Sequence, residues 1–214
     1  MAPVTHLVLF VVAYLLGSIP FGFLLVKFFR KEDIRERGSG NIGATNVVRS
    51  GAKGLGALTF LLDACKGFVA VLFCGWLGVH SPWGAINPND ALAFGALFAI
   101  LGHIYPVWLH FRGGKGVATA FGVFVALAPW AALCSLGVFV LLLLVFRYVS
   151  LGSIVATAIF PVLAWFFPHR PQGLRMWEVI LFLAVLVIYK HRQNIVRLLR
   201  GTEYRFGRPK VETA

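Results

Sequence analysis

Residues 4–29 have the sequence VTHLVLFVVAYLLGSIPFGFLLVKFF, in which Lys27 is the single charged residue. A helix that crosses the hydrocarbon core of a bilayer needs about 20 predominantly apolar residues, so this run predicts a first membrane span. The segment GSIPFG at 17–22 interrupts it, and Pro20 lacks the N–H group that a continuous helix requires, which predicts a kink or break. No basic segment precedes the run and no A-x-A site follows it, which argues against a cleaved signal peptide.

Similar apolar runs recur along the rest of the chain, at 55–79, 91–111, 117–146, 150–167 and 175–190. The run 117–146 is broken near Ala128-Pro129-Trp130, and its first piece, 117–128, would form only ~18 Å of helix against a hydrocarbon core of ~30 Å. With 59% hydrophobic and 13% charged residues, the chain differs strongly from soluble proteins. We expect an all-α, polytopic integral membrane protein with about seven transmembrane helices, the alternative being five or six full crossings. Residues 1–214 are most simply one domain.

The 20 Lys and Arg residues are distributed unequally between the two sides of the membrane. With seven crossings, all of them fall on one side except Lys66, within a span, and Arg170 and Arg175. Basic residues concentrate in cytoplasmic loops, so we expect a periplasmic N-terminus and a cytoplasmic C-terminus. In a soluble protein the formal charge of +12 would suggest nucleic acid as a partner, but here the sidedness accounts for it, and no nucleic acid is expected.

A polar stretch, GSGNIGATNVVRSGAKGLG at 38–56, stands out in this apolar chain. Its glycines allow the backbone to approach a ligand closely, and successive inward N–H groups can bind an anion. Arg49 adds a planar fork that suits phosphate oxygens, and no carboxylate lies between Glu36 and Asp63 to oppose an anion. The alternative for this stretch alone is a flexible membrane loop.

A second stretch of the same kind is GHIYPVWLHFRGGKGVAT at 102–119. Its Gly-Gly-Lys-Gly turn opens a new helix, so free N–H groups, the positive end of the helix dipole and Lys115 converge there. The spacing GxxxxGK[ST] of nucleotide-binding P-loops is absent, because Val117 follows the Lys-Gly pair. The alternative for His103 is a core histidine bonded to a backbone carbonyl.

The third stretch is KHRQNIVRLLRGTE at 190–203, where the last span meets the predicted cytoplasmic side. His191, Asn194 and Arg197 recur at a spacing of three and share one helical face. Taken alone, such a segment is usually a basic juxtamembrane helix that contacts anionic lipids. Together with the other two stretches, it would supply a third set of anion-binding groups to one pocket at the membrane surface.

These three stretches, in this order and spacing, resemble the three motifs of the bacterial acyl-phosphate:glycerol-3-phosphate acyltransferases, the PlsY family. The resemblance covers nearly the whole chain, with least support beyond Glu203. It implies a multi-pass enzyme of the bacterial inner membrane whose motifs face the cytoplasm. It also implies transfer of a fatty acyl group from acyl phosphate to the 1-hydroxyl of glycerol 3-phosphate, which gives lysophosphatidic acid and inorganic phosphate. An upstream enzyme that makes acyl phosphate and the surrounding membrane lipids are the implied partners.

Carried over residue by residue, the resemblance implies that the glycerol-3-phosphate contacts are Ser39, Arg49, Lys115, His191 and Asn194. Of these, Lys115, His191 and Ser39 are the candidate catalytic residues. The glycine-rich turns suit the acyl-phosphate group, whose candidate ligands are Gly40, Asn41, Gly43, Thr45, Asn46, Gly113, Gly114 and Gly116. Candidate walls for the acyl chain are residues 117–128 and 21–25.

The usual machinery of acyl transfer is missing from the sequence. There is no G-x-S-x-G nucleophile elbow, and no histidine is followed by an aspartate five positions later. Asp63 and Lys66 are better explained as an ion pair within a span than as a catalytic base. Because acyl phosphate is already an activated anhydride, we expect direct transfer without an acyl-enzyme. The proton would pass to the substrate's own phosphate or to His191, and both remain open.

We expect no metal and no cofactor, since carboxylates are few and Cys65, Cys74 and Cys134 lie in apolar runs without ligand spacing. A competing interpretation is a transporter or channel for phosphorylated solutes, which should carry polar groups near mid-membrane and an internal repeat. Here the polar groups gather on one predicted side, and no convincing repeat is found. A third interpretation, a scaffold that binds anionic lipids, explains the basic tail but not the paired glycine turns.

Overall fold

The computed structural model of the protein describes residues 2–167 and 171–207. Within these ranges every regular element is a helix and none is a strand, so the all-α prediction is confirmed. Two single 3-10 turns, Ile34–Glu36 and Val107–Leu109, separate some of the helices. The helices are α1 (Ala2–Ser18), α2 (Phe21–Arg30), α3 (Ala44–Arg49), α4 (Lys53–His80), α5 (Pro88–Ile104), α6 (Val117–Leu127), α7 (Pro129–Phe146), α8 (Val149–Phe166), α9 (Leu174–Lys190) and α10 (Arg192–Leu199).

Five helical segments in the described ranges are long and apolar enough to cross a membrane: Pro3–Arg30, Lys53–His80, Pro88–Leu109, Pro129–Phe146 and Val149–Phe166. A sixth is added if α9 and α10, which meet at a bend of 55°, form one span. Large apolar side chains such as Leu144 and Phe166 face outward, as expected of a surface against lipid. Helix α6 is apolar but has only 11 residues, in keeping with the short piece predicted at 117–128.

The predicted interruptions in the apolar runs are present. Helix α1 ends at Ser18 and α2 begins at Phe21, so Ile19 and Pro20 form the break. The Ile19 carbonyl, freed from the helical hydrogen-bond pattern, accepts a hydrogen bond from Lys66 Nζ at 2.7 Å. Lys66 in turn pairs with Asp63 Oδ1 at 2.7 Å, which confirms the predicted ion pair and gives it a role at this break.

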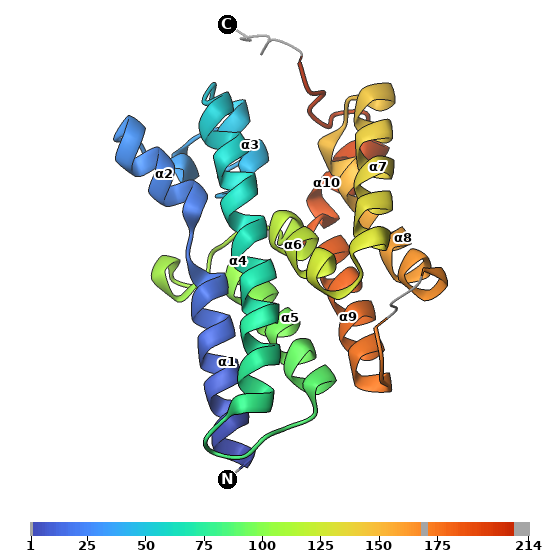
Figure 1. The fold of residues 1–214 in the computed structure, drawn as a ribbon. Coiled ribbons are helices and arrows are strands. Elements are labelled where there is room, and N and C mark those ends of the chain that lie inside the picture. The colour runs from blue at the N-terminus through green and yellow to red at the C-terminus, as the bar shows by residue number, and fades with distance from the viewer. Residues whose placement is uncertain (1, 168–170, 208–214) are drawn as a thin grey trace, which may run out of the picture.

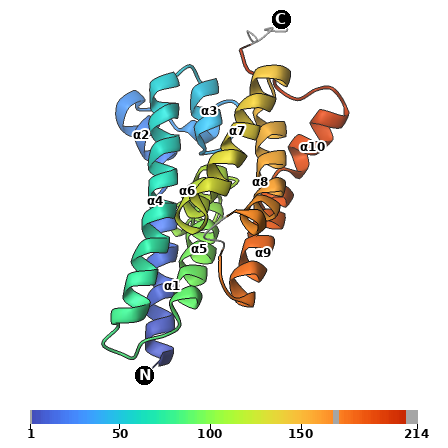
Figure 2. The same cartoon turned by 45° about the vertical axis from the view of Figure 1, so that its right-hand side comes forward.

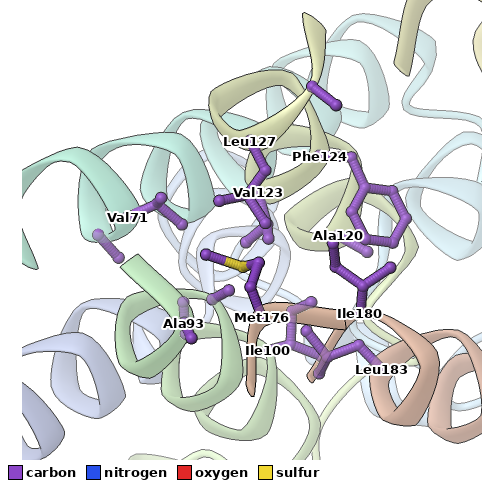
Figure 3. Packing of buried hydrophobic residues seen from close by; sticks show 14 of the residues in the cluster. Val71, Ala93, Ile100, Ala120, Val123, Phe124, Leu127, Met176, Ile180 and Leu183 are labelled. Atoms are coloured by element: carbon purple, nitrogen blue, oxygen red, sulfur yellow. The ribbon is translucent and has the colours of Figure 1, made fainter. Parts of the chain in front are cut away.

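Helices α1, α4 and α5 lie side by side, and α7 packs on α8, which continues to α9 (Figures 1 and 2). Between these groups α6 packs closely on α4. Gly67 and Gly122 permit this approach, because a side chain on either would collide with the backbone of the other helix. Figure 3 shows Met176 of α9 lying among Val71 of α4 and Val123 of α6. Small residues therefore hold the start of α6 against α4, in the middle of the molecule.

The end of the molecule opposite the first turn of α1 carries α2, α3, α10 and residues 201–207 (Figures 1 and 2). The first and third polar stretches therefore converge at one end, as the sequence predicts. Arg170 and residues 208–214, whose basic residues were counted in the predicted distribution of charge between the two sides of the membrane, lie outside the described residues.

Candidate active site

All three polar stretches contribute to one pocket beside the first turn of α6. The five candidate glycerol-3-phosphate contacts, Ser39, Arg49, Lys115, His191 and Asn194, all line this pocket. Of the candidate acyl-phosphate ligands, Asn41, Gly43, Thr45, Asn46 and Gly116 line it, whereas Gly40, Gly113 and Gly114 do not. Residues far apart in sequence, such as Ser39 and Asn194, are thus brought to one polar hollow.

Asn46 organises the first stretch from within. Its Oδ1 accepts hydrogen bonds from the backbone N–H of Ser39 at 2.8 Å and from the Ser39 hydroxyl at 3.2 Å. Its Nδ2, with two hydrogens to donate, lies within hydrogen-bond distance of the carbonyls of Ile34, Arg37 and Asn41, at 3.1, 2.9 and 2.8 Å. With 2% exposure and these contacts, Asn46 shapes the loop and presents Ser39, and the expected contact of Asn46 with acyl phosphate stays a prediction.

The second stretch is fixed by its backbone. The N–H of Gly113 donates to the Ile104 carbonyl and that of Gly114 to the His103 carbonyl, both at 3.1 Å. These two N–H groups are therefore committed inside the protein, in contrast to the expected cradle for an anion. Gly116 adopts a φ of 86°, a left-handed conformation that favours glycine, and leads directly into α6. The turn thereby brings Lys115 into the pocket.

Lys115 is enclosed on the pocket wall and donates a hydrogen bond from Nζ to Asn194 Oδ1. Burial lowers the pKa of Lys115 to about 8, and the neighbouring cations Arg197 and Arg49 act in the same direction while Glu203 opposes them. An ammonium with such a pKa is charged at neutral pH but changes state within a physiologically accessible range. Lys115 is therefore a cation whose charge is sensitive to its surroundings.

His191 occupies the bend between α9 and α10 and is 2% exposed. Its Nδ1 lies 2.8 Å from the Val187 carbonyl. Because a carbonyl can only accept, Nδ1 carries the proton of the neutral imidazole, and Nε2 keeps an accepting lone pair. The ring can thus accept a proton or a hydrogen bond through Nε2, in a pocket that also contains Lys115 and Ser39.

Glu203 holds the third stretch together. Its Oε1 accepts hydrogen bonds from Ser150 Oγ at 2.9 Å and from Asn194 Nδ2 at 2.7 Å, and its Oε2 accepts one from Arg197 Nε at 2.7 Å. Burial would raise the pKa of Glu203, but these three donors outweigh it, and the pKa lies below its usual value. Since Glu203 takes the amide N–H of Asn194, the amide oxygen of Asn194 faces Lys115.

Arg49, the last residue of α3, also lines the pocket. Its guanidinium carbon lies 4.1 Å from the centre of the Tyr204 ring. Burial lowers the pKa of Arg49, with Glu203 acting in the opposite direction, but an arginine remains charged at any pH at which proteins fold. Arg49 and Lys115 thus reach the pocket from different segments, the end of α3 and the turn before α6, and Arg197 of α10, which is paired with Glu203, also lines it.

Comparison with known proteins identifies the family. The model of the family described as "Glycerol-3-phosphate acyltransferase" matches residues 7–201. The chain belongs to this family. A glycerol-3-phosphate acyltransferase of Trichlorobacter lovleyi is 50% identical over 194 residues, which cover 91% of this chain and 94% of that protein.

Two solved structures of PlsY, described as an integral membrane glycerol 3-phosphate acyltransferase, share the fold of this acyltransferase. The glycerol 3-phosphate form gives a TM-score of 0.83 at 43% identity and covers 94% of this chain and 96% of the other. The lysophosphatidic acid form gives 0.80 at 43% identity, with coverages of 94% and 95%. Both confirm that the chain is a multi-pass integral membrane protein.

An apolar cavity adjoins the polar pocket of this acyltransferase. The two share Phe60, Val117, Phe139 and Ser153 as lining residues. The cavity continues between α4, α6, α7 and α8, where its walls are mainly aromatic and aliphatic side chains. Residues of α6 line it, in keeping with the expectation for 117–128, but 21–25 do not, because α2 packs on α3 and α4 instead.

Several residues of the site were not assigned a role from sequence. Glu203 ends the third motif but carried no assignment, and Tyr204 lies outside every motif. Asp63 and His103 also line the pocket, with His103 Nδ1 3.6 Å from Asp63 Oδ1, so His103 faces a carboxylate, whereas the alternative considered for it was a bond to a backbone carbonyl. The only sequence signal for this pair was a carboxylate and a histidine within apolar runs, where charged groups are usually paired.

Proposed function

We propose that this acyltransferase transfers a fatty acyl group from acyl phosphate to the 1-hydroxyl of glycerol 3-phosphate and releases lysophosphatidic acid and inorganic phosphate. The observation that carries the proposal is the junction of a pocket containing two cations with an apolar cavity between membrane helices. One substrate is a small phosphate ester and the other joins a phosphate to a fatty chain. The site therefore needs a cationic pocket for the phosphates directly beside an apolar cavity for the chain. Family membership decides against the transporter interpretation.

In this proposal the residues that contact glycerol 3-phosphate have different roles, which follow from the chemistry of their side chains. Arg49 offers a planar fork to the phosphate that does not react. Ser39, held by Asn46, and the amide of Asn194 orient substrate oxygens. Lys115, at the start of α6, lies between the two substrates, where charge develops during transfer.

The acyl phosphate is proposed to enter from the apolar cavity, with its chain along α6 and its phosphate in the polar pocket. Gly40, Asn41, Gly43, Thr45 and Gly116 remain candidates for contact with this phosphate. Gly113 and Gly114 are better described as the residues that position Lys115, since their N–H groups bond to the backbone of α5. Asn46 likewise acts through the loop that it holds.

The proposed reaction is a single displacement. The 1-hydroxyl oxygen forms a bond to the acyl carbonyl carbon, the bond from that carbon to the phosphate oxygen breaks, and phosphate leaves with the electron pair. The hydroxyl proton passes to a phosphate oxygen or to Nε2 of His191. No acyl-enzyme forms, because acyl phosphate is already activated, and no metal or cofactor takes part. A separate enzyme that makes acyl phosphate must supply the donor.

We also propose that the chain lies in the bacterial inner membrane as one domain, residues 1–214, of seven transmembrane helices, with α6 as the short fourth helix. The N-terminus is periplasmic, and the C-terminus and active site are cytoplasmic, because of where the basic residues fall. Cysteines placed at Ser50 and Thr202 should react with impermeant thiol reagents from the cytoplasmic side alone. Labelling of either from outside intact cells would overturn this orientation.

The reaction is tested with purified protein, acyl phosphate and glycerol 3-phosphate, with phosphate release and lysophosphatidic acid both measured. We expect equal amounts of the two products, no requirement for ATP and no loss of activity in EDTA. Acyl-coenzyme A serves as the control donor and should give no product. Activity that EDTA abolishes and magnesium restores, or product from acyl-coenzyme A alone, would contradict the proposal.

A further inference from the structure

After α10 the chain continues as an extended segment, Gly201–Gly207, which we call the strap. Both terminal glycines have a positive φ, 69° at Gly201 and 83° at Gly207. The strap is fixed to the α7–α8 corner, since Phe206 N–H donates to the Arg147 carbonyl at 2.7 Å and Arg205 Nε donates to Tyr148 Oη at 2.9 Å. With Glu203 bound at its other end, the strap runs along the rim of the polar pocket.

From the middle of the strap, Tyr204 reaches the other side of the pocket. Its ring lies under the guanidinium of Arg49, 4.1 Å from the ring centre to Cζ, although the two residues are far apart in sequence. Arg49 Nε is buried and finds no hydrogen-bond partner within the described residues, and no ion pair there includes Arg49. In the described part of the chain, the Tyr204 ring is thus the partner found at this guanidinium.

A stacked ring orients an arginine in a way that a carboxylate cannot. An ion pair would occupy the N–H groups at the edge of the guanidinium, whereas a ring contacts only its face. The donors of Arg49 therefore stay available in the pocket, and its charge stays uncompensated by a contacting anion. Glu203, the adjacent residue, is turned away and pairs with Arg197 at 2.7 Å.

We propose that Tyr204 is a positioning residue for substrate binding: its ring holds the Arg49 guanidinium in the plane in which its N–H groups meet the phosphate of glycerol 3-phosphate. This inference rests on the proposed function, in which Arg49 binds that phosphate. Tyr204 acts through Arg49 and touches no reacting atom. The strap thereby couples the chain after the third motif to the last residue of α3.

Replacing the ring by an aliphatic side chain tests the inference. Tyr204→Leu should raise KM for glycerol 3-phosphate about fivefold, with kcat unchanged, because the loss concerns a cation–π contact and not the reacting centre. Tyr204→Phe keeps the ring and should behave as the unmodified protein. A matched control is Tyr189→Leu, which removes another arginine–tyrosine stack, Arg192 over Tyr189 at 4.8 Å, away from the pocket, and should change neither constant.

A double-mutant cycle then asks whether Tyr204 acts through Arg49. In an Arg49→Lys background the planar group is absent, so Tyr204→Leu should add less than about a twofold further increase in KM. A full fivefold increase in that background would overturn the inference, as would a Tyr204→Phe variant as impaired as Tyr204→Leu. A loss of kcat with unchanged KM would do the same.

Two further measurements keep the outcomes distinct. If the melting temperature shows that Tyr204→Leu folds poorly, Tyr204→Met is measured in its place, because methionine is a flexible apolar side chain without a ring. If the unmodified protein fails to release phosphate from acyl phosphate and glycerol 3-phosphate, the proposed function itself is wrong. If it is active and Tyr204→Leu matches Tyr189→Leu, the function stands and only the role of Tyr204 is wrong.

Discussion

Arg49 and Lys115, the two pocket cations that pair with no carboxylate in the described residues, carry the same charge in different settings. Arg49 ends the short helix α3, lies over the Tyr204 ring, and keeps its charge at any pH of interest. Lys115 ends a glycine turn, bonds to Asn194, and has a pKa of about 8 because it is buried. A fixed, planar cation suits a phosphate that only binds. A compact cation held by one amide suits the place where charge changes during the reaction.

The difference arises from how the two carboxylates that line the pocket are used: Asp63 pairs with Lys66, and Glu203 with the third motif. Glu203 bonds to Ser150, Asn194 and Arg197 and makes no hydrogen bond or ion pair with Arg49 or Lys115. It acts on Lys115 through Asn194, whose amide oxygen it turns toward the ammonium. The charges of Arg49 and Lys115 are therefore left for two anionic substrates, and the comparison can be tested by changing one cation at a time.

The largest effect is expected from Lys115→Ala. If Lys115 stabilises charge that develops in the transition state, its removal should lower kcat on the order of a hundredfold, as the loss of one oxyanion donor does. KM for glycerol 3-phosphate should change much less. Steady-state kinetics with both substrates varied gives the two constants separately. A change in KM alone would show that the two cations have the same role.

A smaller effect, on KM and not on kcat, is expected from Arg49→Lys. The charge remains but the fork and the flat face are lost, so KM for glycerol 3-phosphate should rise about tenfold, which corresponds to about 1.4 kcal/mol. The value of kcat should stay within about twofold, because this phosphate does not react. Equal losses of kcat in Arg49→Lys and Lys115→Ala would remove the distinction between the cations.

The sequence was sufficient for the features that depend on local chemistry. Pro20 and Pro129 lack an N–H group, so the positions of the breaks beside them follow from the sequence alone. Apolar runs predicted most of the long helices within a few residues, although α5 ends at Ile104 and the run 91–111 continues into a 3-10 turn. The pairing of Asp63 with Lys66 followed from the cost of a lone charge inside a membrane. The five glycerol-3-phosphate candidates, taken from the family motifs, do line one pocket.

What escaped the sequence depends on contacts between distant segments. The N–H groups of Gly113 and Gly114 looked free because the carbonyls that accept from them belong to the end of α5, folded back on the turn. The structural role of Asn46 was not predicted, because its partners, at 34–41, are loop carbonyls without a pattern. Tyr204 could not be assigned, because nothing in a single chain indicates that the strap returns to Arg49.

The smallest effect expected is on the dependence of activity on pH, and it separates the two cations without removing either charge at neutral pH. The pKa of Lys115 lies at about 8, so its ammonium is mostly charged at pH 7 and loses its proton as the pH rises through that value. Since the charged form binds and stabilises the anions, kcat/KM, which reports the free enzyme, should fall about fourfold between pH 7 and 8.5. The fall in kcat should occur at a higher pH than the fall in kcat/KM, because a bound phosphate stabilises the charged ammonium and raises its pKa.

In Lys115→Arg the guanidinium does not titrate, so the fall near pH 8 should disappear even if activity is lower throughout. Arg49→Lys, the matched control, should retain it. A fall that persists in Lys115→Arg would assign the titration to another group and would leave Lys115 as fixed a cation as Arg49.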